Sequence, residues 1–102
     1  MKQIEYSQIV RKKLQSLKAY LTDEFGTVVA QKSIRQITTS VRNLGKFPEK
    51  GVAVSAMYDI ECDYRYIYVS HNYIFYRVEK DAVIIVEMFD EREDFMHKLF
   101  GD

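Results

Sequence analysis

Three strand-like segments in the second half of the chain constrain the fold most strongly. Residues 64–69, 73–79 and 82–89 are rich in β-branched and aromatic residues, and tight turns at His71-Asn72 and Lys80-Asp81 separate them. Asn72 tolerates the positive φ that a two-residue hairpin turn requires. Because connections this short join antiparallel neighbours, the three segments predict a meander of antiparallel strands.

Two amphipathic helices are predicted before these strands. The first follows Ser7, a good N-cap, and runs to about Phe25; the second runs from Thr27 to about Leu44. Their apolar residues recur at spacings of three and four, as Val10, Leu14, Leu17, Leu21 and Phe25, and as Ala30, Ile34, Ile37, Val41 and Leu44. Gly26 and Gly45 suit the helix ends, and the short connection predicts an antiparallel helix hairpin.

The remaining segments complete an α+β domain. Residues 1–6 alternate like an edge strand, and residues 46–54 predict a loop that leads into a strand at about 52–58. Asp90 is a candidate N-cap for a final short helix to Phe100. The predicted order is β-α-α-β-β-β-α, with a helix hairpin packed on a twisted, mainly antiparallel sheet in one domain of residues 1–102.

Side-chain alternation divides the predicted sheet into two faces. An aliphatic face, which we expect to pack on the helix hairpin, contains Ile67, Val69, Ile74, Tyr76, Val78, Ile84, Val86 and Met88. The opposite face contains Tyr66, Tyr68, Tyr73, Phe75, Arg77 and Glu87, and no sequence element obviously covers it. It is therefore predicted either to bind a partner or to consist of cross-strand aromatic pairs that stabilise the sheet.

Charge is unevenly distributed along a chain whose formal net charge is zero. Residues 1–50 carry ten Lys/Arg and four Asp/Glu, whereas residues 51–102 carry five and eleven. The basic half suits a polyanion or an acidic partner segment, or is simply a solvated helix hairpin. The lone Cys62 and the lack of any run near the roughly 18 apolar residues of a membrane span predict a cytoplasmic protein that does not enter the membrane.

The whole chain resembles the RelE/ParE superfamily of bacterial toxins. The resemblance rests on the element order and on FPEKG after the second helix, YRYIYV, NYIFYRVEKDAVIIVEMFDERED and the closing KLFG. It implies the toxin of a type II toxin–antitoxin module, held inactive by a cognate antitoxin. RelE-like members are ribosome-dependent endoribonucleases that cut mRNA, and ParE-like members act on DNA gyrase. The resemblance slightly favours the nuclease; the alternatives are gyrase inhibition or an inactive partner of the antitoxin.

The nuclease hypothesis needs a base for the ribose 2′-OH, cations for the scissile phosphate and an acid for the leaving oxygen. The resemblance assigns these roles to Arg92, Arg77, His97 and Arg65. Alternation places Arg65 on the same face as Ile67, so the alternative for Arg65 is a structural, half-buried arginine. Predicted nucleic-acid or target contacts are Lys46, Lys50, Tyr66, Tyr68, Tyr73 and Phe75, because tyrosines stack on splayed bases. No metal or cofactor is expected.

Overall fold

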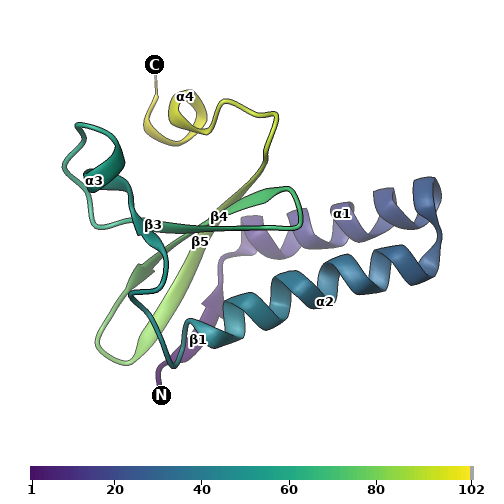
Figure 1. Cartoon of the computed structure of the whole chain (residues 1–102), viewed down its shortest axis with the longest axis horizontal. Coiled ribbons are helices and arrows are strands. Elements are labelled where there is room, and N and C mark those ends of the chain that lie inside the picture. Colours follow the sequence, from purple (N-terminus) through teal and green to yellow (C-terminus); the bar gives the residue numbers. More distant parts are fainter. Residues whose placement is uncertain (102) are drawn as a thin grey trace.

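The computed structural model describes residues 1–101. Its elements are β1 (Gln3–Tyr6), α1 (Gln8–Phe25), α2 (Thr27–Asn43), β2 (Val52–Ala53), α3 (Val54–Met57), β3 (Arg65–Val69), β4 (Asn72–Val78), β5 (Ala82–Asp90) and α4 (Phe95–Phe100). The strands form one sheet in the order β1-β5-β4-β3-β2, in which only the β1–β5 pair is parallel. The predicted α+β architecture, a helix hairpin against a mainly antiparallel sheet, is confirmed (Figure 1).

The helix hairpin forms where the sequence predicts it. The Ser7 side chain caps α1 by accepting a hydrogen bond from the Val10 N–H at 3.2 Å. Gly26, at φ 90°, joins the two helices without an intervening loop. The core beneath the hairpin contains Val10, Ile37, Val41 and Leu44 from the helix side and Ile74, Tyr76, Val83, Ile85 and Met88 from the sheet.

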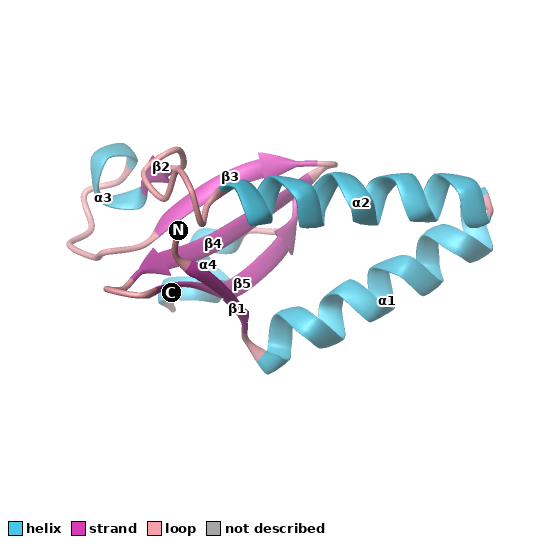
Figure 2. Ribbon diagram, turned by 90° about the horizontal axis from the view of Figure 1, so that it is seen from below, coloured by secondary structure: helices cyan, strands magenta, loops and turns pink. Residues whose placement is uncertain are grey.

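The far half of the hairpin extends beyond the sheet (Figure 2). Phe25, predicted to lie on the packed face of α1, is therefore 60% exposed at the hairpin tip. Periodicity correctly identified the helix, but the sheet is too short to cover its last turns. The apolar stripe at the tip consequently faces solvent.

Three boundary predictions are wrong. The strand predicted at residues 52–58 stops after Ala53 and gives way to the helical turn α3. The last helix begins at Phe95 and is capped by Asp94, because Asp90 still pairs with Asn72 in the sheet. The hairpin turn uses Ser70 and His71, at φ 50° and 66°.

A β-bulge in β5 changes which of its side chains face the helices. Phe75 lies opposite Glu87 whereas Tyr76 lies opposite Ile85, so Val86 is the extra residue between them. The prediction that Ile84 and Val86 face the helices is therefore wrong, whereas the same prediction for Met88 is confirmed. Ile85 and Met88 belong to the core beneath the helices, and Val86 packs on the opposite side.

The loop between α2 and β2 is held in place by the buried side chain of Tyr76. Its hydroxyl accepts a hydrogen bond from the Gly51 N–H at 2.8 Å and donates one to the Pro48 carbonyl at 2.7 Å. A Cβ at Gly51 would overlap that hydroxyl, so the close approach requires glycine. One side chain of the central strand β4 thus fixes a surface loop.

Removing this hydroxyl is expected to destabilise the fold. Tyr76→Phe leaves the Gly51 N–H and the Pro48 carbonyl without their partner, at a cost of about 1–3 kcal/mol in the free energy of unfolding. Urea unfolding followed by circular dichroism measures this difference. Tyr20→Phe, at a tyrosine that is 52% exposed, is the matched control and should change stability little. Equal stability of the two variants would contradict the role assigned to Tyr76.

Candidate functional site

The aromatic face of the sheet is not open. Phe75 is fully buried in a second core with Val54, Phe89 and Phe95, and tyrosines from β3 and β4 pack around it. Helix α4 and the segment that contains α3 lie on this side of the sheet (Figure 1). The prediction of an uncovered aromatic face is therefore wrong, because two short helical segments that the sequence signals only weakly complete a third layer.

The four predicted aromatic contact residues differ in their access to solvent. The ring of Phe95 from α4 lies 5.0 Å from that of Phe75 and 5.1 Å from that of Tyr73, between ring centroids. Tyr66 is half-buried, and its ring lies 6.2 Å from that of Phe95. Tyr68 is the most exposed of the four, at 52%. Phe75 cannot stack on a base in this conformation, and Tyr68 is the aromatic residue best placed to meet a partner.

Tyr68 belongs to a hydrogen-bonded cluster that sequence reasoning missed. Its hydroxyl donates to one carboxylate oxygen of Glu91, and the other oxygen lies 3.0 Å from Nδ1 of His71. The Tyr68 hydrogen bond lowers the pKa of Glu91, and the same bond raises the pKa of Tyr68. No sequence signal indicated this cluster, because Glu91 was assigned to a helix that in fact begins four residues later.

Arg65 supports a loop. It lies on the helix side of the sheet, as alternation predicts, and its guanidinium donates to the Gly51 carbonyl at 2.8 Å and to the Glu49 carbonyl at 3.4 Å. With the Tyr76 hydroxyl, these bonds fix the loop that carries Lys46 and Lys50. Both lysines are exposed on that loop.

Arg77 and Arg92 each form an ion pair with a nearby carboxylate on the chain. Arg77 Nε lies 2.8 Å from Glu79 Oε2, and Arg92 Nε lies 2.8 Å from Asp90 Oδ1. The hydrogen bond between Arg92 and Asp90 lowers the pKa of the Asp90 carboxyl. Because both pairs are well exposed, solvent screens them and each guanidinium remains accessible.

The predicted catalytic residues do not converge on one site. Arg77 lies opposite Ile84, whereas Arg92 follows Asp90, which lies opposite Asn72. Asn72 and Arg77 are separated by five residues along β4, which corresponds to about 17 Å at a strand rise of 3.3 Å per residue.

His97 is exposed on α4, where its backbone N–H donates to Asp94 Oδ1 at 3.2 Å. Arg65 lies on the opposite face of the sheet from Arg77.

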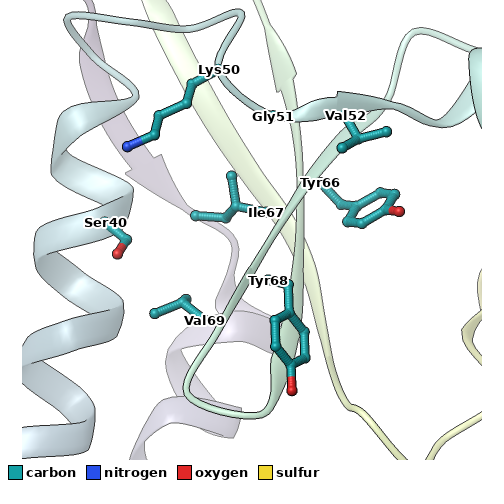
Figure 3. A pocket seen from close by; sticks show the side chains of 8 residues that line it. All are labelled: Ser40, Lys50, Gly51, Val52, Tyr66, Ile67, Tyr68 and Val69. Carbon is teal, nitrogen blue, oxygen red and sulfur yellow. The ribbon is translucent and has the colours of Figure 1, made fainter.

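A groove separates α2 from the free edge of β3. It encloses about 280 Å³ and is lined by Ser40, Lys50, Gly51, Val52, Tyr66, Ile67, Tyr68 and Val69. Figure 3 shows Ile67 and Val69 pointing toward α2, Tyr66 and Tyr68 pointing away from it, and Lys50 extending across the groove toward the helix. A second hollow continues along α2 past Lys32 and Arg35 to Ser70.

The comparisons with known proteins identify the family. The family model for the ParE toxin of the type II toxin–antitoxin system, parDE, matches residues 4–95. The chain belongs to the ParE toxin family. The resemblance to the RelE/ParE superfamily is thus confirmed.

A solved structure has the fold of this ParE-family chain. It is described as the chromosomal ParDE TA system from P. aeruginosa, and it aligns with a TM-score of 0.71 at 15% identity. The alignment covers 88% of this chain and 96% of the other. No curated protein sequence matches the chain. Over residues 1–101 of this ParE-family chain, no helix is long and apolar enough to cross a membrane.

Glu93 links the last strand to α4, and its charge is expected to contribute a pH-dependent part of the stability. Its carboxylate accepts a hydrogen bond from the Asp90 N–H at 2.8 Å and one from Lys98 Nζ at 2.6 Å. The Lys98 bond holds the pKa of Glu93 below its ordinary value of 4.5. A lowered carboxyl pKa stabilises the fold above pH 4.5, and this contribution is lost as pH falls through the lowered pKa.

Glu93→Gln should therefore reduce the free energy of unfolding at pH 7 by less than about 1 kcal/mol, and the difference from wild type should shrink below pH 4.5. Urea unfolding at pH values from 7 to about 3 measures it. Glu24→Gln, at an exposed carboxylate in the last turn of α1, is the control. A difference that stays constant at low pH would exclude this charge effect.

Proposed function

We propose that the chain is the toxin of a type II toxin–antitoxin module and that it acts in the cytoplasm by binding and inhibiting DNA gyrase. Membership of the ParE family is the observation that carries this proposal. A cognate antitoxin would neutralise the protein. The proposed mechanism is inhibition by binding, which requires no catalytic residues on the toxin.

The geometry of the cationic residues supports a binding mechanism over the mRNA nuclease that the sequence resemblance slightly favoured. Arg77 and Arg92 pair with carboxylates at opposite ends of β4, and Arg65 bonds to a loop on the other face. Cleavage of a phosphodiester needs cations and proton-transfer groups within hydrogen-bond distance of the same few atoms in the transition state. The three arginines are too widely separated to surround one phosphate in this way.

An inhibitor that acts by binding needs an exposed surface, and the hairpin tip offers one. Three of the ten large hydrophobic residues that are exposed within residues 1–101 lie there: Phe25, Val28 and Val29. This end of α1 and α2 projects beyond the sheet (Figure 2). Clusters of exposed apolar side chains on a small protein commonly mark protein contacts. We propose that gyrase is bound at this tip.

The proposal is tested by a DNA supercoiling assay with purified gyrase and purified toxin, beside cleavage of a defined message on programmed ribosomes. We expect supercoiling to be inhibited and the message to stay intact. Unaffected gyrase at a large excess of toxin would overturn the proposal. Ribosome-dependent cleavage that Arg92→Ala or His97→Ala abolishes would establish the nuclease instead. Harmless overexpression would indicate an inactive partner of the antitoxin.

The contact at the hairpin tip is tested separately. Val28 is 79% exposed, so Val28→Asp should leave folding intact but weaken gyrase inhibition about tenfold, which corresponds to about 1.4 kcal/mol of binding free energy. Met57→Asp, at a residue on α3 that is 58% exposed, is the matched control. Equal inhibition by the two variants would move the contact away from the tip.

A further inference from the structure

A cationic hollow lies where three segments meet: the start of β1, the turn that follows α2 and the turn between β4 and β5. Figure 1 shows the start of β1 beside the end of α2. Asp81 is the only acidic residue in the lining, which also contains three lysines, so the hollow attracts anions. It encloses about 640 Å³ and is lined by Met1, Lys2, Gln3, Gly45, Lys46, Pro48, Lys80 and Asp81.

Hydrogen bonds of Lys2 hold the walls of this hollow together. Its backbone N–H donates to the Gly45 carbonyl at 2.9 Å, and its Nζ donates to the carbonyls of Glu79, at 2.7 Å, and Lys80. A Cβ at Gly45 would lie 2.5 Å from the Lys2 carbonyl oxygen, so this close approach requires glycine. The Lys2 ammonium is therefore engaged by the chain itself, and it fixes the turn that carries Lys80.

The side chains of Lys46 and Lys80 are available to a ligand. Both residues are exposed, and neither ammonium forms an ion pair within residues 1–101. Arg42, in the last turn of α2, is likewise exposed and forms no ion pair in the same part of the chain. The nearby carboxylate of Glu79 is paired with Arg77. Positive charge at this end of the molecule is thus left to bind anionic groups from solution.

An exposed aromatic ring adjoins these cations. Phe47 is 58% exposed, although its backbone N–H donates to the Asn43 carbonyl at 2.9 Å and its carbonyl accepts from the Lys50 N–H at 3.1 Å. Lys46 Nζ lies 4–6 Å away, at 5.8 Å from the centroid of the Phe47 ring. A ring held on a fixed loop loses little freedom when it binds. The hollow around it, of about 610 Å³, is lined by Lys46, Phe47, Pro48, Glu49 and Lys50.

The combination of the two hollows is selective for one class of anion. They share Lys46 and Pro48, so a bound molecule can contact both. Cations beside an exposed aromatic ring are the arrangement by which proteins bind single-stranded nucleic acid, with phosphates on the cations and a base stacked on the ring. In a duplex the faces of the bases are already stacked on one another. An acidic peptide has charges for the lysines but no base for Phe47.

We infer that this end of the molecule binds single-stranded nucleic acid, with phosphates at Lys46 and Lys80 and a base stacked on Phe47. Lys46 is among the contacts predicted from the sequence, whereas Phe47 and Lys80 are identified by the structure alone. The inference does not depend on gyrase being the target and is measured without gyrase. The two proposals can therefore fail separately.

The test is fluorescence anisotropy of a labelled oligothymidylate of about ten nucleotides, titrated with the purified full chain. At low salt we expect a dissociation constant below about 100 µM, at least about fivefold tighter than for a duplex of the same length. Oligouridylate is measured beside it; binding of either strand supports the inference, and the tighter one identifies the sugar. Undetectable binding of both strands, or tighter binding of the duplex, would overturn it.

Variants of Phe47 test the stacking contact. Phe47→Ala should weaken binding of the single strand at least about fivefold, whereas Phe47→Tyr, which keeps the ring, should bind like wild type. Met57→Ala, at a residue that is also 58% exposed, is the control. Circular dichroism confirms that each variant is folded. Equal affinities of Phe47→Ala and Met57→Ala would contradict base stacking at this position.

The salt dependence of binding tests the phosphate contacts. Lys46→Gln and Lys80→Gln should each reduce the slope of the logarithm of the binding constant against that of the salt concentration by about 0.7. Lys18→Gln, at an exposed residue of α1, should leave the slope unchanged. Equal slopes for all three variants would contradict the assignment of the phosphates to Lys46 and Lys80.

A capped oligoglutamate peptide of similar charge tests whether the hollows bind any anion. We expect it to displace the labelled oligothymidylate at least about tenfold less effectively than unlabelled oligothymidylate does, because it lacks bases for Phe47. Equally effective displacement by the two competitors would overturn the assignment to nucleic acid.

Discussion

The burial of β4 on both faces is the constraint on which the structure depends. Ile74 and Tyr76 are sealed beneath the helix hairpin, and Phe75 between them is sealed beneath α4 and the α3 segment. A strand with one solvated face needs only one covering layer, but this one needs two. The short helical segments are therefore required parts of the core, although neither is long enough to be stable alone.

Because both faces of β4 are buried, charged and polar side chains lie at the edges of the sheet and in the loops. Charged groups cannot enter either core without a partner, so Arg65, Arg77 and Arg92 lie near strand ends, where each bonds to a carboxylate or a backbone carbonyl. The ends of β4 are too far apart for their charged groups to act on one small group of atoms. The spacing of these charged groups in this chain therefore gives no concentrated acid–base site at the ends of β4.

The parts of the fold that could be predicted are those with a long, repeated signal. The helix hairpin follows from ten apolar positions at helical spacing, and β4 from a run of aromatic and β-branched residues between two turns. The prediction fails where a local irregularity of the backbone, such as a bulge or a turn, interrupts the periodicity of the side chains. The bulge at Val86 reverses the predicted faces of β5 from Val83 to Val86, and positive φ at Ser70 and His71 moves the turn by one residue. Neither the bulge nor the positive φ angles can be recognised from the residue types at these positions.

The candidate site was harder to predict because it depends on what covers a surface. Alternation correctly grouped Tyr66, Tyr73 and Phe75, but their exposure is decided by Phe95, about twenty residues later in a helix of six residues. The β3 groove was missed for the converse reason: it exists because β2 stops after two residues, where a longer strand was predicted. A longer β2 would have paired the edge of β3. The early turn into α3 helps to bury the aromatic core and also leaves part of the β3 edge unpaired. One local break in the strand thus determines which surface is buried and which is left open.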